Sequence, residues 1–454
     1  MPLYFGQSTM NATATRYNGH IVVRLSATAA TEAAETHPTH IGLLIDTSGS
    51  MTGTRINSVK RTLEAARPLF RETDTISLVT FYDIGTTHLA RHCLNNEGIE
   101  QFYQVVNNLR PNGATNLSAG LEKLYEIGID YTTLLLLTDG HINKGVIGVA
   151  GLKAMALGAC RSAINTLGYG PDHSRSLLSQ LAIASHGSYT YADTDEVLPV
   201  IVGDILAGVR GEVFRHVEVT VTDAVAVTCQ EIGGAGASYT VGNMVADRDY
   251  WVVFRLAEGD SDLSTIQVSA DGGFTQTVSV TDLGENPAGE RSGEQEQIYR
   301  CRVAHELFSM SELLESRTAD DVRINIARTA LTSLRTEIAA LHGRPLLLRM
   351  MGQIAEALEA LEGLATTGLG RMPAGNHLVA RMSSGVTCLA TQRGYFAGGG
   401  TDGAGDPANT CIFSSPSQRT GSRTVYDTYT HAPDPVAAPA TLSPIIEQAS
   451  APLG

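Results

Sequence analysis

Three polar side chains, Asp46, Ser48 and Ser50, stand at alternate positions of the sequence Asp-Thr-Ser-Gly-Ser. They follow the apolar run 41–45 and precede an amphipathic stretch, so we expect them on a turn between a buried strand and a helix. Open α/β sheets place their ligands just beyond the carboxyl ends of their strands. Small oxygen donors that a turn at Gly49 brings together suit a hard divalent cation such as Mg²⁺, which prefers oxygen ligands.

Two further oxygen donors occur at corresponding places in later segments. Thr115 lies in the loop sequence Asn-Gly-Ala-Thr-Asn, and Asp139 directly follows an apolar run that predicts a strand. Side chains that follow the strands of such a sheet gather at one edge of it. The sequence therefore predicts one metal site formed by Asp46, Ser48, Ser50, Thr115 and Asp139. We expect Mg²⁺ in this site, with Mn²⁺ or Ca²⁺ as substitutes.

Two alternatives use the same residues. The turn could merely cap the following helix, but capping accounts for one polar residue rather than for five in three segments. Ser48 or Ser50 could instead be a nucleophile that His141 activates and Asp46 orients, which also requires an oxyanion hole. The sequence contains no Gly-x-Ser-x-Gly elbow. We therefore predict a protein without catalytic residues, and hydrolysis at the metal stays an alternative that lacks an evident general base.

Two residues are predicted at the rim of this site. Asp83 follows the predicted strand 75–81, and His141 comes two positions after Asp139. Both are candidates for contact with a partner. An ordinary exposed loop carboxylate and an ordinary exposed loop histidine are the simpler interpretations.

The pattern around these donors alternates between apolar runs and helical periodicity over residues 39–210. Apolar runs at 41–45, 75–81 and 132–138 predict buried strands, and an amphipathic pattern over 55–70 predicts a helix. Strands that alternate with helices are typical of parallel sheets covered on both faces. The sequence therefore predicts a doubly wound α/β domain with a mostly parallel sheet.

The rest of the chain follows other patterns. After Gly211 the apolar period becomes two, and short strands between Gly and Asp turns predict an antiparallel β-sandwich over 211–285. Residues 1–38 are predicted to be an N-terminal strand and a linker that belong to this sandwich. Helical patterns predict a helical segment over 286–365. The Gly-, Ser- and Pro-rich tail, 366–454, is expected to be irregular or ordered by a partner.

The composition narrows the class of partner. The 454 residues carry 32 Lys and Arg against 47 Asp and Glu, and the net charge of −15 disfavours nucleic acid and anionic membranes as partners. The six cysteines show no metal-ligand spacing, and no window is apolar enough for a membrane-spanning helix. We therefore predict no nucleic-acid partner, no membrane partner and a cytoplasmic or intracellular location, with a virion as the remaining alternative. The oligomeric state stays open.

The pattern Asp-x-Ser-x-Ser, with a later Thr and a later Asp-Gly, resembles the von Willebrand factor type A domains that carry a metal-ion-dependent adhesion site. The resemblance implies that Ser48 and Ser50 bind the metal directly and that Thr115 does so directly or through water. It implies that Asp46 and Asp139 act mainly through coordinated waters. It also implies that an Asp or Glu of a protein partner takes the open coordination position.

The wider layout is similar to the plant RING-type ubiquitin ligases with a von Willebrand A domain and to the heavy chains of inter-alpha-trypsin inhibitor. The residues that carry this similarity lie in 168–173, 185–191 and 216–221. The Cys and His spacings of a RING are absent from the sequence, so ligase activity is not implied. Two functions stay open: a Mg²⁺-dependent protein-binding module, and a structural or scaffold component of a larger assembly such as a viral particle, with a vestigial or structural metal site.

Overall fold

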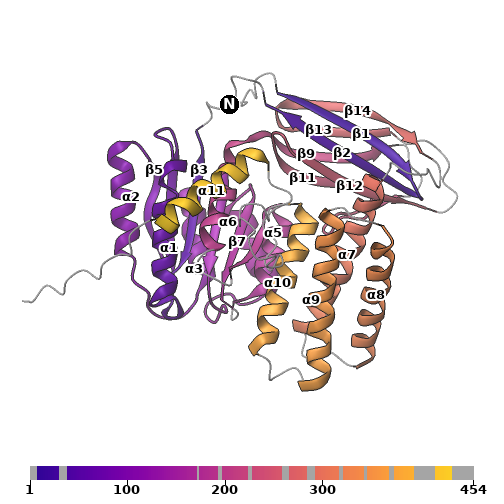
Figure 1. The fold of residues 1–454 in the computed structure, drawn as a ribbon. Helices are drawn as coiled ribbons and strands as arrows, with labels where there is room; N and C mark the ends of the chain where they lie inside the picture. Colours follow the sequence, from indigo (N-terminus) through magenta and orange to yellow (C-terminus); the bar gives the residue numbers. More distant parts are fainter. Residues whose placement is uncertain are drawn as a thin grey trace, which may run out of the picture.

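The computed structural model describes residues 8–29, 38–170, 173–192, 197–222, 227–257, 265–283, 292–315, 321–341, 345–367, 373–392 and 415–431. These residues form an α/β part, an eight-stranded β-sheet and a group of long helices. In Figure 1 the α/β part lies on the left, the eight-stranded sheet at the upper right and the long helices at the lower right. The boundaries given above for separate domains stay predictions.

The α/β part is built on a six-stranded sheet with the strand order β5-β4-β3-β6-β7-β8. All neighbours in this sheet are parallel except β4 and β5, which form an antiparallel pair at one edge. The predicted doubly wound, mostly parallel sheet is therefore confirmed. Its strands are β3 (His40–Asp46), β4 (Thr75–Phe81), β5 (Gly85–Cys93), β6 (Thr133–Thr138), β7 (Ile164–Tyr169) and β8 (Tyr189–Ala192).

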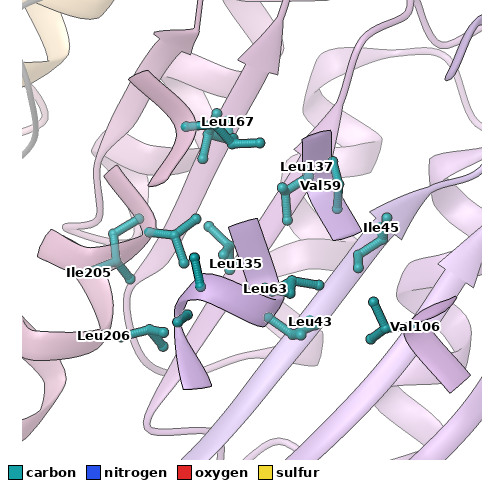
Figure 2. Close-up of a cluster of buried hydrophobic side chains, with 14 of the residues drawn as sticks. Leu43, Ile45, Val59, Leu63, Val106, Leu135, Leu137, Leu167, Ile205 and Leu206 are labelled. Carbon is teal, nitrogen blue, oxygen red and sulfur yellow. The ribbon is translucent and has the colours of Figure 1, made fainter. Parts of the chain in front are cut away.

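Helices cover both faces of this sheet and create two apolar cores. Successive side chains of a strand face opposite ways, so in β3 Leu43 and Ile45 enter one core and Leu44 enters the other. Figure 2 shows the first core, in which Leu135 of the sheet lies beside Leu63 of a covering helix. The first face is covered by α1 (Thr54–Ala65), α2 (Asn96–Asn108) and α6 (Val197–Arg210), and the second by α3 (Leu117–Ile127), α4 (Val149–Ala159) and α5 (Arg175–Ala184).

The eight-stranded sheet has the order β10-β12-β2-β1-β14-β13-β9-β11, and its two halves enclose a single apolar core. Six of its neighbouring pairs are antiparallel, but β1 and β14 are parallel, with Ala14 opposite Val280. The predicted sandwich is present, and the prediction that it is wholly antiparallel is wrong at this pair. Its strands are β1 (Thr9–Tyr17), β2 (His20–Thr28), β9 (Glu212–Thr222), β10 (Val227–Cys229), β11 (Ser238–Val245), β12 (Asp249–Leu256), β13 (Thr265–Ala270) and β14 (Phe274–Asp282).

The N-terminal region forms a hairpin of two strands, β1 and β2, where the sequence predicted one strand. The turn is Asn18-Gly19, and both residues have positive φ angles, 46° and 69°. Such a two-residue turn matches the natural twist of a hairpin. This hairpin lies between β12 and β14 in the sheet, and its direction there makes β1 parallel to β14.

Long helices fill the third part of the molecule and share one apolar core. They are α7 (Ser292–Glu315), α8 (Asp321–Ala339), α9 (Pro345–Thr367) and α10 (Pro373–Thr391). The first three lie where the sequence predicted helices. Among the ranges that the structure describes, no helix is long and apolar enough to cross a membrane.

The expectation of an irregular or partner-ordered tail is wrong for two segments. α10 packs against α5 and β8 of the α/β part and against α7 and α9, and α11 (Pro416–His431) packs against α1 and α6. The hydroxyl of Ser384 in α10 donates to the Tyr189 carbonyl at 3.3 Å and accepts the Tyr191 N–H at 3.4 Å, so α10 covers the edge strand β8. The tail residues 393–414 and 432–454 lie outside the described residues.

Small residues explain the close packing of α11 against α6. A Cβ atom on Gly421 of α11 would lie 2.4 Å from the Cβ of Ala207, and one on Gly203 of α6 would lie 2.7 Å from the Cα of Ser422. The two backbones therefore approach more closely than larger side chains would allow. Val425 and Tyr429 of α11 then enter the apolar core that α1 and α6 share.

Candidate metal site

Asp46 is the last residue of β3 and is fully buried. Its Oδ1 accepts the backbone N–H of Ser48 at 2.7 Å, and its Oδ2 accepts the hydroxyl of Thr138 at 2.5 Å. Thr138 ends the neighbouring strand β6, so the carboxylate connects two strand ends. Burial raises the pKa of Asp46 to about 6, because desolvation disfavours the charged form. A cation beside this carboxylate would favour its ionised form.

The hydroxyls of Ser48 and Ser50 and the carboxylate of Asp139 form a continuous row. Ser48 Oγ and Ser50 Oγ are 3.0 Å apart, and Ser50 Oγ donates to Asp139 Oδ1 at 2.7 Å. Both serines are positioned by the short 3-10 helix η1 (Gly49–Met51) that follows β3. Ser48 and Asp139 are buried and Ser50 between them is exposed, so the row reaches the surface at its middle hydroxyl.

Thr115 reaches the same place from the loop that precedes α3. A Cβ atom placed on Gly140 would lie 3.2 Å from Thr115 Oγ1 and 3.4 Å from Ser50 Oγ, so both hydroxyls flank this glycine. The loop is fixed to the motif by the N–H of Asn112, which donates to the Thr47 carbonyl at 2.7 Å. The structure thus brings together all five residues that the sequence singled out as metal donors.

The two predicted rim residues lie on loops at this edge. Asp83 Oδ1 accepts Lys144 Nζ at 2.9 Å and the Ala114 N–H at 3.3 Å, and these hydrogen bonds, the one to Lys144 first, lower the pKa of Asp83. His141 is exposed, and its Nδ1 lies 3.4 Å from the hydroxyl of Ser174. Within the part of the chain that the structure describes, neither side chain is hydrogen-bonded to any of the five donors.

Two further residues support the site and were missed in the sequence. Arg55, in the first turn of α1, forms an ion pair with Asp139 through Nη1 and Oδ2, and the same Nη1 lies 3.4 Å from the Ser50 carbonyl. Asn143 Oδ1 accepts the Thr115 N–H at 2.9 Å. An arginine five positions after Ser50 is visible in the sequence. Its contact with Asp139 depends on the first turn of α1 lying beside the end of β6, which no local pattern reveals.

The chemistry of the donor set fits a hard divalent cation. Three donors are neutral hydroxyls and two are carboxylates, and soft sulfur or imidazole ligands are absent from the set. Four of the five are buried and already held in place by hydrogen bonds. Across the described residues, no group of three or more His, Cys, Asp or Glu side chains is placed to hold a metal. The hydroxyl-rich cluster is therefore the candidate that the geometry supports.

Residues 41–141, which include all five donors, match the family model of the von Willebrand factor type A domain. The chain therefore contains a von Willebrand factor type A domain over these residues. It is 28% identical over 179 residues to inter-alpha-trypsin inhibitor heavy chain H3 of Rattus norvegicus, which is 36% of this chain and 20% of that protein. It is 24% identical over 172 residues, 34% of this chain, to the protein sll0103 of Synechocystis and covers 38% of it. The chain thus spans less than half the length of these curated relatives.

Two solved structures share the fold over most of this chain. A von Willebrand factor type A protein from Catenulispora acidiphila is 14% identical, with a TM-score of 0.57 over 83% of this chain and 96% of that one. The ArnB paralog VWA2 from Sulfolobus acidocaldarius is 13% identical, with a TM-score of 0.53 over 85% and 98%. At these identities the likeness concerns the fold alone. Because the coverage is so large, it extends beyond the von Willebrand A domain itself.

Proposed function

We propose that the von Willebrand A domain binds a protein partner through a Mg²⁺ ion held by Asp46, Ser48, Ser50, Thr115 and Asp139. The convergence of five oxygen donors from three segments, with Ser50 and Thr115 flanking Gly140, is the observation that carries this proposal. Mn²⁺ and Ca²⁺, which also prefer oxygen ligands, are the expected substitutes. An Asp or Glu of the partner would complete the coordination.

The hydroxyl and carboxylate residues would hold the ion in different ways. Ser48, Ser50 and Thr115 would bind it through hydroxyls, while Asp46 and Asp139 supply the negative charge. A divalent cation held mostly by neutral oxygens keeps part of its charge uncompensated, so it attracts a further carboxylate. Ser50 is exposed, which leaves the site open to a partner on its outer side.

A binding role accounts for the hydroxyls better than a catalytic one. Ser48 and Ser50 contact each other and Asp139, while the ring of His141 lies near Ser174 instead of either serine. A serine nucleophile requires a base within hydrogen-bond reach. We therefore propose a binding module that performs no reaction.

The alternative function is a structural or scaffold component of a larger assembly. A tail that a partner orders would favour this alternative, in which the sandwich and helices also provide contacts. Two helices of that tail, α10 and α11, pack on the same chain, so this part of the argument no longer favours the alternative.

Calorimetric titration of the full chain with Mg²⁺ tests the proposal. We expect saturable binding of one ion to the wild type and loss of binding in the double variant Ser48→Ala/Thr115→Ala. Thr52→Ala is the matched control, because this exposed hydroxyl on the same turn donates to the Gly49 carbonyl and lies outside the donor set. Equal Mg²⁺ binding by the wild type and the double variant would contradict the proposal.

A further inference from the structure

Three aliphatic side chains are exposed on the loops beside the candidate metal site. Ile84 is 55% exposed, Val146 40% and Ile147 66%. Seven large hydrophobic side chains are this exposed among the described residues, and the other four lie on α3, α8 and α9. Exposed apolar side chains gathered in one place mark interaction surfaces, whereas single ones are common. We call Ile84, Val146 and Ile147 the aliphatic rim.

The two loops of the aliphatic rim are tied to each other by an ion pair. Lys144 Nζ contacts Asp83 Oδ1 at 2.9 Å, and each residue stands one or two positions from a member of the rim. The Val146 N–H donates to Ser118 Oγ at 3.1 Å, which fixes the second loop to the start of α3. The ion pair of the neighbouring residues and the backbone hydrogen bond of Val146 therefore hold the rim in place.

The same loop is tied to one of the metal donors. The N–H groups of Asn143 and Lys144 donate to the Thr115 carbonyl at 3.1 and 3.3 Å, and Asn143 Oδ1 accepts the Thr115 N–H at 2.9 Å. Val146 follows Lys144 by two positions, and two residues of chain span at most about 7 Å. Val146 therefore lies within roughly 10 Å of the Thr115 carbonyl.

Two cationic side chains on this edge are exposed enough to contact an acidic partner. Arg55 and Lys144 are 31% and 49% exposed at their side chains, and both project beside oxygen groups of the site. The Arg55 Nη1 is occupied by Asp139 and the Ser50 carbonyl, whereas Nη2 lies beside Gly170, where a Cβ would be 3.3 Å away. An arginine fork with further N–H donors is well suited to a second carboxylate.

We infer that the partner presents an Asp or Glu with an aliphatic residue one or two positions away, which packs on the aliphatic rim. This inference rests on the proposed function, because the metal site fixes where the carboxylate binds. A carboxylate alone would be recognised on any protein surface, since acidic residues are common there. The adjacent aliphatic side chain supplies the selection among acidic segments, because burying it against Ile84, Val146 and Ile147 contributes affinity.

Selection from a library of displayed random 12-residue peptides tests the inference. Peptides are captured on the full chain in Mg²⁺, eluted with EDTA and sequenced, and the selection is repeated on Val146→Ser/Ile147→Ser. We expect the wild-type eluate to be enriched in Asp or Glu within two positions of Ile, Leu or Val. On the variant the acidic enrichment should remain and the aliphatic enrichment should vanish. A peptide from the wild-type pool should bind the variant roughly ten- to a hundredfold more weakly.

The control is Val322→Ser/Ile326→Ser, which removes two aliphatic side chains of α8, 67% and 64% exposed, that lie outside the rim. It should behave like the wild type. Ile84→Ser provides a second rim variant if the double variant folds poorly. An acidic pool without aliphatic enrichment, or one whose aliphatic enrichment survives in both rim variants, overturns the inference and leaves the proposed function standing. An EDTA eluate without enriched peptides counts against both.

Discussion

Arg55 and Asp139 form an ion pair at the opening of the candidate metal site. Nη1 of the arginine contacts Oδ2 of a fully buried carboxylate, and Oδ1 of that carboxylate accepts the Ser50 hydroxyl at 2.7 Å. The cation of Arg55 therefore stands beside a donor that a bound Mg²⁺ would also use. Like charges in such proximity repel each other, so the arginine is expected to weaken metal binding.

Removal of this cation should strengthen Mg²⁺ binding. In Arg55→Gln we expect the dissociation constant for Mg²⁺ to fall about fivefold, since a repulsion on the order of 1 kcal/mol is removed. Calorimetric titration measures this dissociation constant. Arg61→Gln on the same helix is the control, because Arg61 lies over the ring of Tyr429, 4.5 Å from its centroid. Weaker Mg²⁺ binding by Arg55→Gln would show that the arginine supports the site instead.

The contact between α6 and α11 should not tolerate a methyl group. Gly203→Ala places a Cβ 2.7 Å from the Cα of Ser422, and overpacking of this kind costs about 1–3 kcal/mol. Alanine is otherwise the better helix former by about 1 kcal/mol. The control Gly352→Ala in α9, where a Cβ would meet nothing within 4 Å, should be neutral or stabilising. Thermal unfolding of both variants tests this prediction, and equal unfolding midpoints would contradict a tight α6–α11 contact.

Removing one partner of the buried ion pair between Glu231 and Arg300 should strongly destabilise the fold. The two side chains are 1% and 0% exposed, and Arg300 Nη1 also donates to the Leu389 carbonyl of α10 at 2.7 Å. Arg300→Met leaves an uncompensated buried carboxylate, which is expected to cost about 3–5 kcal/mol.

The matched comparison replaces both partners of that pair. The double variant Glu231→Leu/Arg300→Met should recover a large part of the loss, because no charge is then left buried. Arg302→Met, which breaks the exposed pair with Glu337, should change stability by less than about 1 kcal/mol. Thermal denaturation followed by circular dichroism compares the stabilities of these three variants. A double variant as unstable as Arg300→Met would contradict this account of the pair.

Stability should fall with acid before the ordinary exposed carboxylates, with pKa values of about 4, titrate. Burial lowers the pKa of His173 to about 3 and that of His40 to about 4. Both histidines are neutral in the folded chain, while in the unfolded chain they take up a proton near pH 6.5. Their contribution is therefore complete above pH 6.5 and is lost progressively as the pH falls from 6.5 towards 4, by up to about 1.4 kcal/mol per pH unit for each.

A variant isolates the share of His173 in this acid sensitivity. His173 is fully buried, with Nε2 at 2.5 Å from the Tyr189 hydroxyl and Nδ1 at 2.6 Å from the Gly170 carbonyl. His173→Gln should be less stable than wild type at pH 7.5 but should lose less stability between pH 7 and 4.5. Urea unfolding at a series of pH values measures both. Parallel curves for the two proteins would contradict a buried neutral histidine.

The sequence predicted those parts of the structure that depend on local patterns. The buried strand β3 is a continuous apolar run, and the donors at its end follow in the next five positions, so both could be recognised without three-dimensional information. Thr115 and Asp139 could be added because each stands at the end of a predicted strand or loop of the same sheet. The turn Asn18-Gly19, by contrast, was overlooked as a hairpin signal, so the strand β1 before it was missed.

The features that the sequence did not reveal depend on contacts between distant segments. α10 buries Ser383 and Ser384, and α11 depends on Gly421 against Gly203, so their sequences look polar or flexible until the surfaces that receive them are known. Helices of this kind gain most of their stability from tertiary packing. The contacts of Arg55 with Asp139 and of Thr138 with Asp46 likewise join residues more than eighty positions apart.

The central claim is that Ser48, Ser50 and Thr115 jointly hold a divalent cation. Diffraction from crystals of the full chain grown with Mn²⁺, recorded at the manganese absorption edge, tests it most directly. We predict one anomalous peak within bonding distance of Ser48 Oγ and Ser50 Oγ, replaced in Mg²⁺ crystals by density about 2.1 Å from its oxygen ligands. A peak elsewhere in the chain, or no peak and an undisturbed Ser48–Ser50 contact of 3.0 Å, would contradict it.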